Sequence, residues 1–289
     1  MKLSFINKKD CSVNLKDFLQ KENGVSARLI TKLKRQHLGI TCGGELIRTI
    51  DDVPPGAEVV LNISDENEIV PNGALDVPVI YEDEHVVVFS KPQGMPVHPS
   101  MNHYTDTLGN FFSWMYPDIT FRPVNRLDRN TSGLCVAAKN QHSAALLQRS
   151  VEKTYYALIC GTPYRLSGTI DAPIKRQTES MITRCVAPDG QRAVTHYTVL
   201  SSCGKYSWVR VKLETGRTHQ IRVHFSYTGF PLAGDDLYGG CCDDAHGQTL
   251  HCGDVSFPDS DGNVISLSTE PGENIQSIFR KYNFEMISM

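Results

Sequence analysis

The residues best suited to chemistry form a short charged stretch in the middle of the chain. Asp128 lies between Arg126 and Arg129, and Asn-Thr-Ser-Gly at 130–133 has the composition of a turn. Nearby positive charge favours the ionised form of a carboxyl group, so we expect Asp128 to be a carboxylate. In a loop it can act as a nucleophile, a base or an ion-pair partner. By composition alone, a surface aspartate in a salt-bridged turn is the more common explanation.

A second stretch with reactive residue types lies further along the chain. Gly216 is expected in a tight turn, and Thr218 is predicted to cap a helix that begins after it. On such a helix His219 and Arg222 lie near one face. We do not predict a metal site at His219 and His224, because their spacing does not bring both imidazoles onto one ion.

One tyrosine adds a side chain that can handle an aromatic ring. Tyr155 lies in a β-rich run at residues 153–159. Such a side chain can stack on a base or exchange a proton through its hydroxyl group. Taken alone, it is better explained as a half-buried strand residue.

The nine cysteines include no Cys-x-x-Cys pair. Without a predicted signal segment, we expect them to be reduced thiols. One cluster has the residue types of zinc ligands but a spacing that fits no common zinc signature; it consists of Cys241, Cys242, His246, His251 and Cys252. We therefore predict no metal ion and no cofactor.

Length and composition set the class of protein. The 289 residues correspond to about two domains, and 40% hydrophobic and 21% charged residues are ordinary for a soluble globular protein. No apolar run approaches the ~20 residues of a membrane span, and the N-terminus lacks the apolar core of a signal peptide. We expect a cytoplasmic monomer. The formal net charge of -3 argues against non-specific coating of nucleic acid, although a local basic surface can still bind RNA.

Residues 1–66 have the pattern of a small separate domain. Its predicted elements are an edge strand at 1–10, a helix from Asn14 to Gly24, a helix capped by Ser26, a hairpin at 40–47 and a strand at 58–63. This order resembles the S4-like RNA-binding module. Its second helix carries Arg28, Lys32, Lys34 and Arg35. These charges suit an RNA backbone, although a solvated amphipathic face explains them equally well.

A polar linker at 67–75 leads to a larger predicted domain at 76–289. Strands are expected at 77–81, 85–89, 133–139, 153–159, 168–174, 192–200 and 206–213. Helices are expected at 108–114, 141–152 and 273–282. Strands dominate this part of the chain, so the charged stretches must lie in loops at the edge of a sheet.

The stretch from Asn125 to Leu134 closely resembles the catalytic motif of the RluA family of RNA pseudouridine synthases, His-Arg-Leu-Asp-x-x-Thr-Ser-Gly. Asp128 falls on the nucleophilic aspartate of that family, and Asn125 stands where histidine is usual. Further segments match the family in the same order: Lys-Pro-x-Gly-x-x-Val-His at 91–98, Lys-x-Tyr at 153–155, Thr-Gly-Arg-x-His-Gln-Ile-Arg at 215–222, and Gly-x-Pro, Gly-Asp and Tyr-Gly at 229–239.

The resemblance implies an α+β fold, with a mixed, mostly antiparallel central sheet, a catalytic cleft and an S4-like α/β module outside it. It implies conversion of uridine to pseudouridine in structured RNA, with large-subunit ribosomal RNA favoured and tRNA as the alternative. Asp128, Tyr155 and Arg222 are then the catalytic residues, with Arg222 orienting Asp128. The residues then expected to bind the substrate are Arg126, Arg129, Thr131, Arg217, His219 and Gln220.

Two other functions are compatible with these motifs. One is an RNA-binding relative that has lost catalysis, for which Asn125 is a warning sign. The other is a hydrolase that acts on a small nucleoside through Asp128 and has no use for a basic helix.

Overall fold

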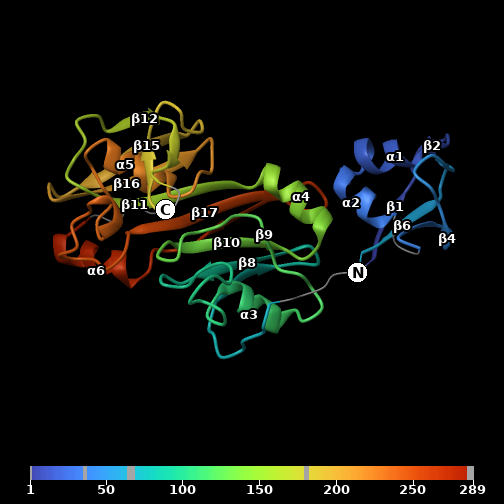
Figure 1. The fold of residues 1–289 in the computed structure, drawn as a ribbon, viewed down its shortest axis with the longest axis horizontal. Coiled ribbons are helices and arrows are strands. Elements are labelled where there is room, and N and C mark those ends of the chain that lie inside the picture. Colours follow the sequence, from blue (N-terminus) through green and yellow to red (C-terminus); the bar gives the residue numbers. More distant parts are fainter. Residues whose placement is uncertain (1, 35–37, 64–68, 179–181, 285–289) are drawn as a thin grey trace.

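The computed structural model describes residues 2–34, 38–63, 69–178 and 182–284, and these form two units along the chain (Figure 1). The N-terminal unit is built on a four-stranded sheet, and the larger unit on a ten-stranded sheet. None of the helices in these parts of the chain has the length and apolar character that a membrane crossing requires.

The N-terminal unit contains the predicted strands, helical segments and hairpin in the predicted order, and it adds a short pair of strands that was not predicted. Its elements are β1 (Lys2–Ile6), β2 (Val13–Asn14), α1 (Leu15–Asp17), the π-helical turn η1 (Phe18–Glu22), α2 (Ala27–Leu33), β3 (Ile40–Cys42), β4 (Glu45–Leu46), β5 (Asp52–Val53) and β6 (Glu58–Asn62). The antiparallel sheet has the order β1-β6-β3-β4. Asn14 and Ser26 cap α1 and α2 through their side chains, and Gly24 has a φ of +66° after η1.

Helix α2 divides into an apolar and a basic face. Leu29, Ile30 and Leu33 are buried in the core of the N-terminal unit. The charged residues between them stay in solvent, because burying an unpaired charge is costly. The exposed ones are Arg28, Lys32 and Lys34, while Arg35 lies outside the described residues.

The larger unit has the mixed, mostly antiparallel sheet expected from the sequence. Its strands are β7 (Val79–Glu82), β8 (Val86–Lys91), β9 (Arg122–Pro123), β10 (Ser132–Ala138), β11 (Glu152–Cys160), β12 (Ser167–Asp171), β13 (Ile174–Arg176), β14 (Arg184–Val186), β15 (Val194–Ser202), β16 (Tyr206–Leu213), β17 (Leu250–Pro258) and β18 (Val264–Ser268). Its helices are α3 (Leu108–Met115), α4 (Gln141–Ser150), α5 (Gln220–Tyr227), the 3-10 turn η2 (Asp236–Tyr238) and α6 (Glu273–Tyr282). The main path of the sheet is β12-β15-β16-β11-β17-β10-β8-β7.

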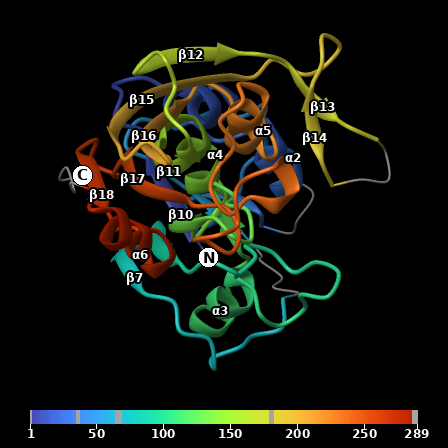
Figure 2. The same cartoon turned by 90° about the vertical axis from the view of Figure 1, so that its left-hand side faces the viewer.

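One predicted strand is divided in the structure. The run 168–174 becomes the end of β12 and the start of β13, separated at Ala172 and Pro173. Proline has no backbone N–H to donate to a continuing ladder, which explains the break. Strand β13 then pairs with β14 rather than with the main sheet. The resulting hairpin extends beyond the sheet beside α5 (Figure 2).

The centre of the large sheet depends on a close approach between β10 and β17. These strands run parallel, with Gly133 opposite Cys252, whereas every other pairing among the described strands is antiparallel. Gly133 has a φ of +105°, and a Cβ there would lie 2.2 Å from the Cys252 carbonyl oxygen. A side chain is therefore excluded at the point where the loop that contains Asp128 enters the sheet.

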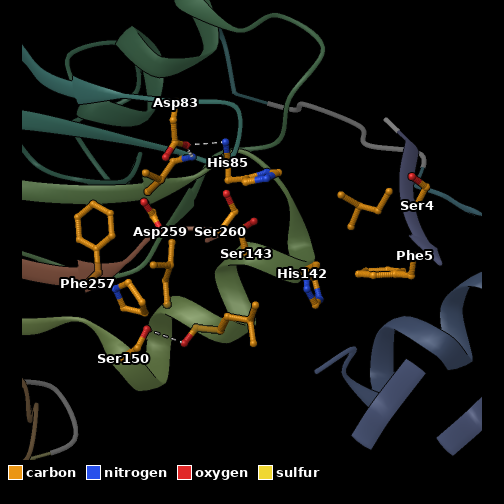
Figure 3. Close-up of a pocket in the computed structure, with 15 residues that line it drawn as sticks. Ser4, Phe5, Asp83, His85, His142, Ser143, Ser150, Phe257, Asp259 and Ser260 are labelled. Atoms are coloured by element: carbon orange, nitrogen blue, oxygen red, sulfur yellow. Dashed lines mark hydrogen bonds between the residues drawn. The ribbon is translucent and has the colours of Figure 1, made fainter. Parts of the chain in front are cut away.

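The two units touch through β1 and α4. The Phe5 ring meets the His142 ring edge-on, with their centroids 5.4 Å apart. Gly24 leaves room for Leu146, since a Cβ at that glycine would lie 2.9 Å from Leu146 Cδ2. A cavity of about 430 Å³ remains at this junction, and its lining includes Ser4, Phe5, His85, His142 and Phe257 (Figure 3).

We predict that Gly133→Ala lowers the free energy of unfolding by at least about 2 kcal/mol more than Gly204→Ala does, because only the first adds a steric clash to the strain of a positive φ. Gly204 is a matched control, with a φ of +84° and nothing within 4 Å of the added Cβ. Urea denaturation followed by circular dichroism measures both variants. Equal losses would show that contact with β17 does not constrain position 133.

Candidate active site

A cleft of about 790 Å³ opens between the loop that precedes β10 and the loop that precedes α5. Strand β11 forms its wall, so three segments far apart in sequence meet there. Five of the residues predicted for the site line this cleft: Arg126, Asp128, Tyr155, Arg217 and His219. The cleft contains a carboxylate, cationic side chains and an aromatic side chain, which suits an anionic substrate that carries a ring.

Asp128 is held by an arginine from α5. The Nη1 of Arg222 donates to Oδ2 of Asp128 at 3.2 Å, as predicted from the sequence. The side chain of Asp128 is 28% exposed and that of Arg222 only 7%, so Asp128 lines the cleft and Arg222 lies behind it. The buried cation leaves the carboxylate accessible and oriented.

A second carboxylate fixes the guanidinium of Arg222. Its Nε and Nη2 donate to the two oxygens of Asp235 at 2.7 and 2.8 Å, and the Asp235 side chain is fully buried. Burial acts to lower the pKa of Arg222, but Asp235 and Asp128 outweigh it and raise that pKa overall. We did not assign Asp235 to the site from sequence, although the matched Gly-Asp segment contains it and pointed to this position.

His219 occupies the turn into α5 rather than the helix itself. It has a φ of 57° and makes no side-chain cap, and Thr218 does not cap the helix as predicted. Gln220 instead ties the preceding turn to the start of the helix, because its Oε1 accepts from the Arg217 backbone N–H at 2.9 Å. The helix can therefore begin later than predicted, with the His219 side chain turned toward the cleft.

The His219 ring lies between a carboxylate and a phenol. Its Nε2 is 3.8 Å from Oδ2 of Asp128, and its Nδ1 is 2.8 Å from the Tyr238 hydroxyl. Burial lowers the pKa of His219, and the attraction of Asp128 only partly opposes this. The imidazole is consequently neutral at neutral pH.

Tyr155 is a buried phenol in the wall of the cleft. Its exposed fraction is 7%, and Cys135 and Cys252 belong to the same core cluster. Burial, reinforced by Cys252, raises the pKa of Tyr155 well above its usual value. The residue therefore offers a ring face and a protonated hydroxyl group, and it cannot act as a base at neutral pH.

The loop at 125–131 is held by two side chains, Asn125 and Lys91, of which Asn125 also lines the cleft. Asn125 Nδ2 donates to the Leu134 carbonyl at 3.0 Å, and its Oδ1 accepts from the Val136 N–H at 2.8 Å. The ammonium of Lys91 donates to three backbone carbonyls, including that of Arg129 at 3.1 Å. Burial lowers the pKa of Lys91 to about 8. Asparagine at 125 thus ties the loop to β10.

Three residues predicted to bind substrate do not line the cleft. Arg129 is exposed and lies beside His103, with Nη1 3.4 Å from Nε2. Thr131 is buried and accepts a hydrogen bond from Gln248 at 3.2 Å. Gln220 is buried and donates to the Val194 carbonyl at 3.0 Å. Their substrate-binding role stays a prediction, whereas their observed contacts are with other parts of the chain.

The cysteines and histidines at 241–252, which have the residue types of zinc ligands, make contacts with other parts of the protein. All nine cysteines are free thiols. His251 is bonded to Ser132 and to the Thr269 carbonyl, at 2.9 and 3.0 Å. Among the residues that the structure describes, no three His, Cys, Asp or Glu side chains are arranged to hold a metal ion.

Comparisons with known proteins gave matches over most of the chain. A family model described as RNA pseudouridylate synthase matches residues 85–227. The chain is 36% identical over 247 residues to the Bacillus subtilis protein named "Uncharacterized RNA pseudouridine synthase YjbO", covering 82% of this chain and 87% of that one. It is 39% identical over 239 residues to "Ribosomal large subunit pseudouridine synthase D" of Pseudomonas aeruginosa, covering 76% and 74%.

The fold is shared with solved structures. That of human RNA pseudouridylate synthase domain containing 1 is similar with a TM-score of 0.57 and 23% identity, covering 75% of this chain and 98% of that chain. This likeness concerns the fold and supports the assignment to a mixed sheet.

We predict that Asp235→Asn lowers the free energy of unfolding by about 3–5 kcal/mol, because it leaves the buried Arg222 without its bidentate partner. The control is Asp189→Asn, which removes a pair with Lys175 on the surface and is expected to leave stability nearly unchanged. Thermal denaturation measures both. A small effect at Asp235 would mean that Asp128 alone suffices to compensate the guanidinium.

Proposed function

Because the chain belongs to the RNA pseudouridine synthase family, we propose that it isomerises uridine in large-subunit ribosomal RNA with Asp128 as the catalytic carboxylate. The observation that carries this proposal is the arrangement of Asp128, which lines a cleft and is held at 3.2 Å by Arg222. The reaction breaks the bond between N1 and the ribose, turns the base and rejoins it through C5. It involves no net oxidation or reduction.

In this proposal the carboxylate of Asp128 is the group that reacts with the nucleotide. Attack on the ribose, attack on the base and removal of a ribose proton all require an unprotonated carboxylate aimed into the cleft. Arg222 supports it, since a guanidinium stabilises and orients the charged form. Tyr155 is proposed to stack on the uracil, and its raised pKa keeps its hydroxyl group protonated.

The target nucleotide must leave its helix to reach Asp128, at a cost of a few kcal/mol. Arg126 is exposed at the rim of the cleft and is proposed to enter the space that the nucleotide vacates. Arg217 and His219 line the same cleft and are proposed to contact the RNA. We propose that Arg129, Thr131 and Gln220 affect substrate binding indirectly, by fixing the conformation of the loops around the cleft.

We also propose that residues 1–66 form an S4-like RNA-binding module, with a linker at 67–75 and the catalytic domain at 76–289. The support is the order of helices and strands in the N-terminal unit and the exposed basic residues of α2. Residues 69–75 approach α3, where Asn110 donates to the Val70 carbonyl at 2.7 Å. A monomer in the cytoplasm remains our expectation.

Ribosomal RNA is proposed because a relative with 39% identity is named as a ribosomal large subunit enzyme. Mapping pseudouridines in cells that lack this protein tests the choice. Loss of a site in large-subunit ribosomal RNA is the expected result. Loss confined to tRNA would instead identify a tRNA enzyme of the same family.

Replacing Asp128 by Asn or Ala should abolish pseudouridine formation, because neither side chain supplies a carboxylate, while RNA affinity should stay within about threefold. Tritium release from RNA labelled at C5 of uridine measures product, and filter binding measures affinity. Asp261→Asn, on an exposed turn, serves as the control. Full activity of Asp128→Ala would refute the catalytic role. An inactive unsubstituted protein would indicate a binding relative, and activity on free uridine would indicate a nucleoside hydrolase.

Replacing Arg28 and Lys34 together by Gln should weaken RNA binding without changing the maximal rate. Each lost phosphate contact should reduce the slope of log affinity against log salt by about 0.7–0.9. Lys16→Gln, exposed on the neighbouring helix α1, provides a control of equal charge type. An unchanged salt dependence in the double variant would assign α2 to a solvated face.

A further inference from the structure

Tyr238 connects three parts of the site that are far apart in sequence. It ends η2, and its hydroxyl lies 2.9 Å from the backbone nitrogen of Arg184 in β14 and 2.8 Å from Nδ1 of His219. Its ring faces the guanidinium of Arg222, whose Cζ is 4.9 Å from the ring centroid. One side chain thus contacts the β13–β14 hairpin, the histidine beside Asp128 and the arginine that holds Asp128.

We propose that Tyr238 is a positioning residue that sets the tautomer of His219, so that His219 presents an N–H to Asp128 while the β14 backbone holds Tyr238 in place. This role deepens the proposed function, because it concerns how the same carboxylate is prepared for reaction. It assigns to His219 an N–H that is directed toward Asp128, in addition to its place in the cleft.

The direction of the hydrogen bonds follows from their donors. The Arg184 N–H can only donate, so the oxygen of Tyr238 accepts from it. The hydroxyl proton of Tyr238 is then available to Nδ1 of His219. Burial raises the pKa of Tyr238, which keeps this proton on the phenol.

The tautomer follows from the acceptor. A neutral imidazole carries one proton, so when Nδ1 accepts from Tyr238 the proton is on Nε2. That nitrogen lies 3.8 Å from Oδ2 of Asp128. In the opposite tautomer an Nε2 lone pair would face the carboxylate, which is repulsive. The charge of Asp128 therefore favours the same tautomer of His219 as the hydrogen bond from the Arg184 N–H to Tyr238 does.

The separation of His219 from Asp128 has a consequence for reaction. At 3.8 Å this contact is longer than a hydrogen bond, whereas Arg222 donates directly to Oδ2 at 3.2 Å. The carboxylate keeps the lone pairs that it needs for a nucleotide. In this proposal the Nε2–H of His219 stabilises negative charge near Asp128 through electrostatic attraction as the reaction proceeds.

Tyr238→Phe tests this role, because it removes the hydroxyl but keeps the ring against Arg222. We expect kcat for pseudouridine formation to fall about three- to tenfold, as for loss of one hydrogen bond, with little change in KM. Tyr164→Phe is the matched control, since Tyr164 is 100% exposed. In a His219→Ala background the same change should add no further loss, because the bond that it removes is already absent.

The pH profile separates positioning from mere packing. A bond from Tyr238 to Nδ1 favours the neutral imidazole, so its loss should move the acid limb of kcat to higher pH. The charged groups that face His219 are Asp128, Arg222, Arg184 and Asp235, and they are unchanged in Tyr238→Phe. An acid limb that does not move, together with an unchanged kcat, would overturn the proposal.

Nitrogen-15 NMR of the imidazoles, with the His219 signal assigned by its loss in His219→Asn, tests the tautomer in the unsubstituted protein. We expect the Nε2–H tautomer of His219, and a mixture of tautomers in Tyr238→Phe. The Nδ1–H tautomer in the unsubstituted protein would refute the proposal even if Tyr238→Phe failed to fold. This measurement needs no activity, whereas inactivity on every RNA would count against the proposed function alone.

Discussion

The guanidinium of Arg222 lies between two carboxylates and forms a different number of hydrogen bonds with each. It gives two hydrogen bonds to the fully buried Asp235 and one to the partly exposed Asp128. The bidentate pair offsets the desolvation penalty of burying both charges and fixes the plane of the guanidinium. One positive charge cannot neutralise two negative ones, so the surplus negative charge lies on the side chain that faces the cleft. The loops, the sheet and α5 are arranged so that this interaction can form.

The polar side chains that support the site share one feature: each forms hydrogen bonds with the protein backbone. Asn125 is bonded to β10, Lys91 to three carbonyls around the catalytic loop, and Gln220 to the turn before α5 and to Val194 in β15. Buried polar groups that are fully bonded define one geometry, because any other leaves a donor or acceptor unsatisfied. The cleft residues can then keep their own hydrogen-bonding capacity for RNA.

Most elements of the fold could be predicted from periodicity and capping residues. Helix α6 begins and ends at the predicted residues, and Ser26 caps α2 as its sequence position indicates. The conformation of the loops was harder to predict. The spacing of residues shows which segments are polar, but it does not show in which direction each side chain points. Asp128 points into the cleft and Arg129 away from it although they are adjacent, and Asp235 acts through a contact with α5 that no local pattern encodes.

The place of β17 in the sheet affects how the chain is made. This strand lies between β10 and β11, although it is synthesised long after both. As a nascent chain grows from its N-terminus, the facing edges of β10 and β11 remain unpaired until β17 emerges, and unpaired edges are templates for pairing with other molecules. The N-terminal sheet, complete by Asn62, has no such delay. During translation the protein therefore carries a finished small unit ahead of an open sheet, which closes only when its central strand arrives.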